Sequence, residues 1–252
     1  MTTTQSFLGQ NFACLSVRRT AERIAQRPKD APLSYVVTPN ADHLVRLSRD
    51  ASLRDIYRRA GLCLLDSQAV SLLARLLRMS APPVVRGSDL AERLLTHHLL
   101  PGERIAVIGL SPVWLPALMA RFDLAPPAHY DPPLGFDQNP AELAKIEAFI
   151  RAYPARFIFL AVGSPRQEIL AHRLARSQCL TGTALCIGAG LEFLCGARRR
   201  APALLRASGL EWAWRLAGEP RRLGRRYLLD SPRIIGLLMR QRLNRTPRTL
   251  QV

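Results

Sequence analysis

The sequence predicts an α/β fold: a Rossmann-like, largely parallel sheet with helices on both faces, followed by a helical, arginine-rich C-terminal appendage. Short continuous apolar runs alternate with stretches of helical periodicity, which is typical of strands buried on both faces of a parallel sheet. Beyond Gly196 the pattern changes to arginine-rich helical segments interrupted by proline and glycine. We therefore expect an α/β domain over residues 1–196 and a basic amphipathic helical appendage over residues 197–252.

The size and charge of the chain narrow the partners it can have. Its 252 residues suffice for one large α/β domain, and its formal net charge is +17. Such a charge predicts attraction to polyanions: nucleic acid, an anionic membrane or phosphorylated substrates. Residues 197–252 hold fourteen arginines against three acidic residues and so supply 14 − 3 = 11 of the excess charges. The anionic partner should therefore meet the C-terminal end.

The first half of the chain shows three units of strand, turn and helix. After a mixed region over residues 1–32, in which one helix is expected over Val17–Gln26, each apolar run leads through a polar or glycine-containing turn into a helix. Between the second and third units, Ser88 or Asp89 is expected to cap a further helix that begins near Leu90. The three expected strands are Ser34–Val37, Leu62–Leu65 and Arg104–Ile108.

The second half continues the alternation. A proline-rich loop is expected from Pro126 to Pro133, and Asn139 begins a helix that runs to about Ala152. Two further buried strands are expected over 157–162 and 184–187, and each ends in a glycine turn. Ligands of such sheets bind beyond the carboxyl ends of the strands. That rule predicts one convergent rim made of Thr38–Asn40, Asp66, Gly109, Gly163–Gln167 and Gly188–Gly190.

Three polar side chains at expected strand ends are candidates for substrate contact. Thr38 and Asn40 offer a hydroxyl and an amide suited to a sugar or nucleotide hydroxyl, although Asn40 is equally suited to cap the next helix. Asp66 directly follows a strand, where a carboxylate that faces a cleft can act as a general base. The alternative for Asp66 is a simple helix cap.

The glycine turns at Gly109, Gly163 and Gly188 allow the backbone to approach a phosphate or a nucleotide closely. None belongs to a strict G-x-G-x-x-G motif and no Walker A motif occurs, so neither a dinucleotide cofactor nor a P-loop is indicated. Gln167 and Glu168 stand at a helix start, where they either contact a base or ribose or cap that helix.

No metal or other cofactor is predicted. The adjacent His97 and His98 lie on different helical faces, and the chain has no D-x-D segment to hold a divalent ion on a nucleotide diphosphate. Charge on a leaving diphosphate would then fall to arginines, and the C-terminal segment supplies them. Trp212 and Trp214, interleaved with those arginines, favour a helix at a membrane interface over a nucleic-acid patch.

The compartment is predicted to be the cytoplasm. The chain opens without a signal peptide and has no apolar run long enough to span a bilayer, so membrane contact should be peripheral. The five cysteines show no C-x-x-C spacing and are expected to be thiols, mostly buried.

In order along the chain, these motifs resemble the WecG/TagA/CpsF family of bacterial glycosyltransferases. The resemblance covers about residues 35 to 230. It is carried by Thr38-Pro39-Asn40, Asp66, Gly87-Ser88-Asp89, Gly163-Ser164-Pro165-Arg166-Gln167-Glu168, Gly209-Leu210-Glu211-Trp212 and Glu219-Pro220-Arg221-Arg222-Leu223. It implies inverting, metal-independent transfer from a UDP-sugar to an undecaprenyl-diphosphate-linked saccharide at the inner face of the plasma membrane. The sugar would be N-acetylmannosamine, its uronic acid or glucose.

The resemblance also assigns roles to residues. It implies that Asp66 is the base, that Thr38, Asn40 and the turn Pro165–Glu168 contact substrate, and that three arginines of the appendage bind diphosphate and lipid: Arg215, Arg222 and Arg225. The chain departs from the family pattern at Val84, where an arginine is usual, and we hypothesise that Arg86 takes over its substrate contact.

Two other functions use the same features. A nucleic-acid-binding protein would exploit the charge, and a Rossmann-type oxidoreductase would exploit the sheet, but neither has its recognition motif here. A glycosyltransferase without a nucleic-acid partner is therefore the favoured interpretation. The donor sugar, the acceptor glycan and the oligomeric state, a homo-oligomer included, stay open.

Overall fold

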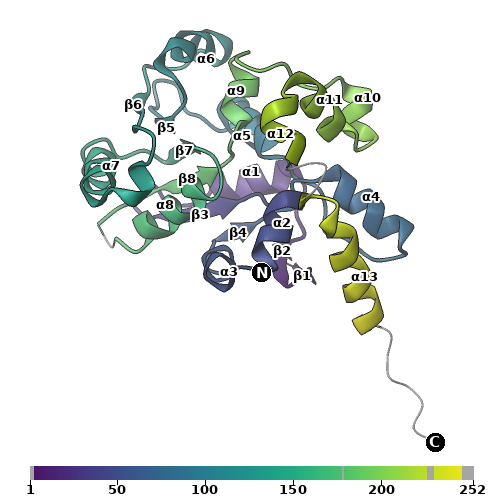
Figure 1. Ribbon diagram of the computed structural model, residues 1–252. Helices are drawn as coiled ribbons and strands as arrows, with labels where there is room; N and C mark the ends of the chain where they lie inside the picture. Colours follow the sequence, from purple (N-terminus) through teal and green to yellow (C-terminus); the bar gives the residue numbers. More distant parts are fainter. Residues whose placement is uncertain (1–2, 178, 226–229, 246–252) are drawn as a thin grey trace, which may run out of the picture.

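A six-stranded, all-parallel sheet forms the centre of the protein, as shown by a computed structural model that describes residues 3–177, 179–225 and 230–245 (Figure 1). The strand order is β4-β3-β8-β7-β5-β6, and every neighbouring pair is parallel. The strands are β3 (Ser34–Val37), β4 (Leu62–Cys63), β5 (Ala106–Gly109), β6 (Ala128–Tyr130), β7 (Phe157–Ala161) and β8 (Thr183–Cys186). The predicted Rossmann-like α/β fold is confirmed.

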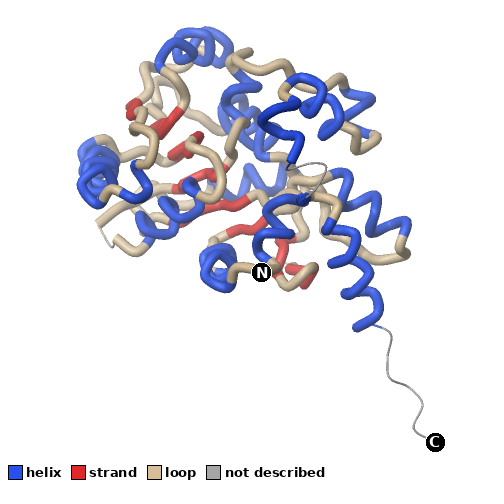
Figure 2. Tube along the Cα trace, viewed as in Figure 1, coloured by secondary structure: helices blue, strands red, loops and turns tan. Residues whose placement is uncertain are grey.

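Helices cover both faces of the sheet. Successive residues of a strand point to opposite faces, so each strand contributes side chains to a hydrophobic cluster on either face. Phe157 and Phe159 lie in one hydrophobic cluster, whereas Ile158 and Leu160 of the same strand lie in the other. The helices that contribute to the first cluster are α1 (Val17–Ala25), α5 (Gly87–His97), α6 (Leu115–Phe122) and α9 (Gly190–Leu194). On the other face lie α2 (Ala41–Leu47), α3 (Ala51–Arg58), α7 (Pro140–Ala152) and α8 (Arg166–Ala175), so the sheet is sandwiched as Figure 2 shows.

Two strand regions differ from the sequence prediction. The mixed N-terminal region contains an antiparallel hairpin of β1 (Thr4–Phe7) and β2 (Gln10–Ala13), whose Phe7 and Phe12 are fully buried and meet edge to face. The proline-rich segment expected as a loop contains β6, which pairs with β5 at the edge of the sheet. An edge strand tolerates flanking prolines because it needs ladder hydrogen bonds on one side only.

Helix starts follow the expected chemistry except at α5. The side chain of Asn139 accepts from the backbone N–H groups of Ala141 and Glu142 at the start of α7, as expected. The predicted cap of α5 by Ser88 or Asp89 is wrong, since this helix already begins at Gly87 and no side chain caps it. Ser88 and Asp89 instead accept hydrogen bonds from Arg200, which fastens the C-terminal segment to the body.

The C-terminal segment is helical, as predicted. It contains α10 (Ala203–Ala207), α11 (Glu211–Gly218), α12 (Pro220–Arg225) and α13 (Arg233–Arg245). The last helix runs beside α2 and α4 (Gln68–Leu76), and its Ile234 and Leu238 are buried in the core of the body (Figure 1). Two short 3₁₀ turns, η1 (Pro112–Trp114) and η2 (Phe136–Gln138), complete the described structure. No helix among the described residues has the length and apolar character needed to cross a bilayer.

Candidate active site

A cavity of about 840 Å³ lies where the carboxyl ends of β4, β3, β8 and β7 face the C-terminal helices. Its floor comes from the strand ends, with Thr38, Asp66, Gly163 and Gly188 among the lining residues. Its opposite wall comes from α4, from α11 and from the start of α13. The body and the C-terminal segment therefore enclose this space together.

Thr38 and Asn40 reach the cavity from the end of β3. The Thr38 hydroxyl donates to the backbone oxygen of Cys186 at 3.1 Å, which ties the ends of β3 and β8 together. Asn40 caps α2, because its Oδ1 accepts from the backbone N–H groups of Asp42 and His43. The capping alternative for Asn40 is thus observed, and the same residue also lines the cavity.

Asp66 lies on the cavity floor, just beyond β4. Its Oδ2 accepts a hydrogen bond from the backbone N–H of Gly87 at 3.0 Å, so the carboxylate is anchored to the start of α5. Burial raises the pKa of Asp66 to about 6, an effect that the Gly87 hydrogen bond opposes. A carboxyl group with such a pKa is largely ionised at neutral pH and can still accept a proton effectively during a reaction.

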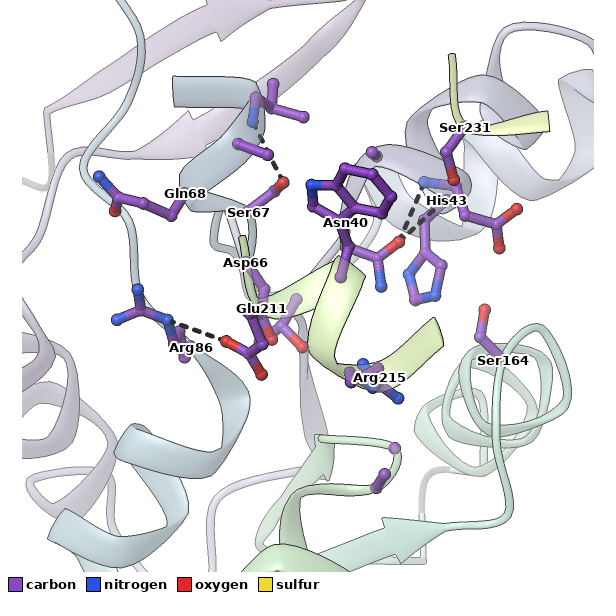
Figure 3. Close-up of a pocket in the computed structure, with 18 of the residues that line it drawn as sticks. Asn40, His43, Asp66, Ser67, Gln68, Arg86, Ser164, Glu211, Arg215 and Ser231 are labelled. Carbon is purple, nitrogen blue, oxygen red and sulfur yellow. Dashed lines mark hydrogen bonds and ion pairs between the residues drawn. The ribbon is translucent and has the colours of Figure 1, made fainter. Parts of the chain in front are cut away.

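Three charged side chains surround Asp66 and come from two parts of the chain. Glu211 opens α11, and its Oε2 lies 3.8 Å from Nε of Arg86, as Figure 3 shows. The negative charges of Glu211 and Asp89 raise the pKa of Asp66, whereas the positive charge of Arg86 lowers it. The arginine additionally donates to the backbone oxygen of Arg206 at 2.9 Å. The C-terminal segment thus sets part of the electrostatic environment of Asp66.

The glycine turns after β7 and β8 lie beside each other in the cavity wall. Gly188 has a positive φ of 55°, and its N–H donates to Oε1 of Gln167 at 2.9 Å. The other end of that amide donates to Glu168, which is fully buried. Burial raises the pKa of Glu168. A backbone N–H in the first turn of α8 also hydrogen-bonds the Glu168 carboxylate, so this residue helps to cap the helix start, and Gln167 links the two turns.

Three expected site residues do not line the cavity. Gly109 follows β5, which lies on the far side of β7 from β8, and a Cβ there would come within 2.9 Å of the Ala161 backbone. Gly109 thus stands at the carboxyl end of β5 beside Ala161, as the rim requires, but it permits close strand packing and does not line the cavity. Pro165, which follows a cis peptide bond, and the buried Glu168 are likewise not among the lining residues.

Arg215 faces the cavity from α11, one helical turn beyond Glu211 (Figure 3). Its guanidinium lies over the ring of Phe193, 5.6 Å from the ring centre, which holds it in place. Arg198 also lines the cavity and pairs with Glu192 and Glu219. The side chains of Arg222 and Arg225, the other two expected diphosphate contacts, lie outside the described part of the structure.

Several lining residues carry functional groups that the sequence did not single out. His43 is buried, hydrogen-bonds through Nδ1 to Tyr57 at 3.3 Å, and lines the cavity one turn into α2. Ser164 lines it from the turn after β7 and accepts a hydrogen bond from Arg46. Glu211 belongs to the segment Gly209–Trp212, which carries part of the family resemblance, but no role was predicted for it. The signal for His43 was its position three residues after Asn40, on the first turn of the same helix.

Among the described residues, no group of three or more His, Cys, Asp and Glu side chains could hold a metal ion.

Substituting Glu211 by glutamine tests the electrostatic link between α11 and Asp66. Removing this negative charge should lower the pKa of Asp66, because Glu211 raises that pKa while Arg86, freed from its partner, lowers it. Any activity that needs the Asp66 carboxylate should then persist to lower pH, as a pH–rate profile would show. An acidic limb that stays in place would mean that Glu211 does not act on Asp66.

Comparison with protein families bears on this geometry. The model of the Glycosyl transferase WecG/TagA/CpsF family matches residues 5–248, nearly the whole chain. The match includes the strand ends, the turn after β7 and the C-terminal helices that together form the cavity. Of the three functions considered from the sequence, it selects the glycosyltransferase.

Proposed function

The chain belongs to the WecG/TagA/CpsF family of glycosyltransferases, which act in cell-surface polysaccharide biosynthesis, and from this premise we propose a specific reaction for the cavity. A sugar passes from a UDP-sugar to a saccharide linked to undecaprenyl diphosphate, with inversion and without a metal ion. The transferred sugar is N-acetylmannosamine, N-acetylmannosaminuronic acid or glucose. The observation that carries the proposal is Asp66, a carboxylate with a raised pKa on the floor of a cavity closed by arginine-bearing helices.

Asp66 acts as the general base in this proposal. Its carboxylate accepts the proton of an acceptor hydroxyl while that oxygen attacks the anomeric carbon of the donor. The bond from the anomeric carbon to the UDP oxygen breaks on the opposite face of the sugar, and UDP leaves with the bonding electron pair. A single displacement of this kind inverts the anomeric configuration. The support is the position of Asp66, which lines the cavity and is held by Gly87.

The donor is proposed to lie over the ends of β3, β8 and β7. There the turns at Gly163 and Gly188 allow close backbone approach, and Thr38, Asn40 and Gln167 offer polar groups. Arg215 is proposed to stabilise the charge that develops on the departing diphosphate, aided by Arg222 and Arg225 of α12. Arg86 is proposed as a substrate contact near the acceptor because it lines the cavity beside Asp66.

We also propose that residues 197–252 act as an appendage that closes the active site and brings the enzyme to the cytoplasmic face of the membrane. Its net positive charge suits anionic lipid headgroups, and Trp212 and Trp214 are each 39% exposed. Peripheral binding at the inner face would place the cavity within reach of a lipid-linked acceptor.

A donor screen tests the reaction. Purified full-length protein should transfer sugar from at least one of UDP-N-acetylmannosamine, UDP-N-acetylmannosaminuronic acid and UDP-glucose to a prenyl-diphosphate-linked monosaccharide, and should do so in EDTA. The product's anomeric configuration, read by NMR, should be opposite to that of the donor. Retention of configuration, or transfer that stops in EDTA and returns with a divalent ion, would contradict the proposed mechanism.

A further inference from the structure

The cavity has two chemically different ends. Asp66, Arg86, Glu211 and Arg215 gather at one end. Farther along α4 from Asp66, the lining includes aliphatic side chains from two helices in contact, namely Leu72, Leu73 and Leu76 of α4 and Ile234 and Ile235 of α13. A cavity with charges at one end and aliphatic groups at the other complements an amphiphile whose head is anionic.

The aliphatic end opens onto the surface and continues there as an apolar stripe. Leu76 is 79% exposed at the end of α4. On α13, Ile235, Met239 and Leu243 are 48%, 40% and 69% exposed and are spaced four residues apart, so they share one side of the helix. The neighbouring side of α13 carries Ile234 and Leu238, which are buried in the core. The exposed stripe therefore leads outward from the cavity, beside α4.

The two helices that border this opening carry charges of one sign. Neither α4 nor α13 contains an acidic residue, whereas Arg75 lies on α4 and several arginines lie on α13. Asp230, just before α13, pairs with Arg233, so the described charges on the two helices themselves are all cationic. Aliphatic side chains on helices with such charges suit the surface of an anionic bilayer. The opening therefore has the composition expected where a lipid chain would pass from a bilayer into a protein.

We propose that the aliphatic end of the cavity, between α4 and α13, binds the isoprene units next to the diphosphate of the lipid-linked acceptor. This assignment rests on the proposed function, because it takes the acceptor to be a polyprenyl diphosphate. The lipid chain would leave the cavity along Leu76 and Ile235 toward the bilayer, while the acceptor diphosphate stays near Arg86, the proposed acceptor contact. α4 belongs to the α/β body, so acceptor binding would need both parts of the chain.

Contact with a flat bilayer alone does not account for the inner part of this wall. Leu72 and Leu73 are only partly exposed and line the cavity itself. Gly209, in the loop before α11, covers the start of α4 so closely that a Cβ there would come within 3.0 Å of the Leu72 side chain. A membrane surface does not reach side chains under such a loop, but a single isoprenoid chain that enters from the opening does.

Binding of isoprenyl diphosphates of increasing length tests the proposal. Isopentenyl, geranyl and farnesyl diphosphate are titrated against the full-length protein by calorimetry, without vesicles and below the concentration at which they aggregate. The dissociation constant should fall by at least about tenfold from isopentenyl to farnesyl diphosphate, because each added isoprene unit buries apolar surface. Leu76→Gln and Ile235→Gln should remove most of that gain.

A matched control is Leu204→Gln on α10. Leu204 is 80% exposed, close to the 79% of Leu76, but does not line the cavity, so its substitution should leave the dependence on chain length intact. An affinity independent of chain length in the unmodified protein, or an equal loss in Leu204→Gln, would overturn the proposal. So would Leu76→Gln that weakens binding to anionic vesicles but keeps the chain-length dependence, since the leucine would then only touch the bilayer.

The readout separates this inference from the proposed reaction. Binding of an isoprenyl diphosphate needs no donor sugar and no turnover. If the donor screen fails while affinity still rises with chain length, the lipid groove stands and the reaction is wrong. If transfer succeeds while affinity is independent of chain length, the reaction stands and the groove is wrong.

Discussion

Replacing Asp66 by asparagine is expected to reduce the turnover of sugar transfer by about 10²–10⁴-fold, the usual contribution of a general base. The asparagine oxygen can still accept from the N–H of Gly87, so the local backbone should keep its position. Binding of the UDP-sugar should change little, since the proposed donor contacts lie over the ends of β3, β8 and β7. Single-turnover transfer and donor binding by calorimetry measure the two effects separately.

The same substitution should leave the protein equally stable or more stable at neutral pH. The pKa of Asp66 is raised from 3.8 to about 6 in the folded protein, so folding favours the protonated carboxyl group. The stability contributed by that group is complete below the unfolded pKa and is lost as the pH rises through about 6. At pH 7 the wild type therefore carries a penalty of roughly 1–3 kcal/mol, which asparagine removes.

Urea unfolding of both proteins at pH 7 and pH 4 checks this prediction. The stability advantage of Asp66→Asn should shrink as the pH falls, because the wild-type carboxyl group becomes protonated. An inactive variant that is also less stable at pH 7 would indicate a structural role for the ionised carboxylate. Turnover equal to that of the wild type would remove Asp66 from the mechanism altogether.

Replacing Arg215 by alanine is expected to lower the turnover by about 10²–10³-fold, as is typical when one group that stabilises transition-state charge is lost. Arg215 lines the cavity and is held over Phe193, so its guanidinium is already in place before the reaction. Arg215→Lys should recover part of the loss, because lysine keeps the charge but not the planar, two-pronged geometry. Single-turnover rates at saturating donor measure the effect.

Arg221→Ala is the matched control for Arg215. Arg221 is exposed on α12 and does not line the cavity, so its loss removes the same charge from the C-terminal segment without removing a cavity contact. Its turnover should stay near the wild-type value. Equal losses in the two variants would mean that the segment contributes only its overall charge, and the assigned role of Arg215 would fall.

Deletion of the C-terminal segment is not a suitable test of its role. Deleting everything after Gly196 would remove Ile234 and Leu238, which are buried in the core of the body. Such a truncation would expose apolar core surface, and lost activity would not separate a structural effect from a catalytic or membrane effect. Single substitutions at exposed or cavity-lining positions avoid this ambiguity.

The fold was predictable because the central strands are continuous apolar runs between clear turn signals. The strand predicted over Ser34–Val37 has the same bounds as β3. The N-terminal hairpin was missed because its strands are only four residues long and carry polar residues such as Gln5 and Asn11. Their stability comes from Phe7 and Phe12 packing on the core, a tertiary effect that local sequence does not reveal.

The candidate site was predictable only for residues whose placement follows from the end of their own strand, without knowledge of the order of the strands in the sheet. The rule that ligands bind beyond strand ends correctly brought Thr38, Asp66, Gly163 and Gly188 to one cavity. Gly109 also ends a strand, as predicted, but it does not line the cavity because β5 lies on the far side of β7, and strand order is not visible in local sequence patterns. Glu211 raises the pKa of Asp66 only because α11 docks beside this residue, and the sequence does not reveal that docking.

The dependence of turnover on pH tests most directly whether Asp66 of this shared cavity is the base of sugar transfer. For the wild type, kcat/KM, which reports ionisations of the free enzyme, should rise with pH through a single ionisation near pH 6, the pKa to which burial raises Asp66. In Asp66→Asn the residual rate should lose that ionisation. A wild-type kcat/KM that is flat from pH 5 to pH 8, or an ionisation near pH 6 that persists in Asp66→Asn, would contradict the account.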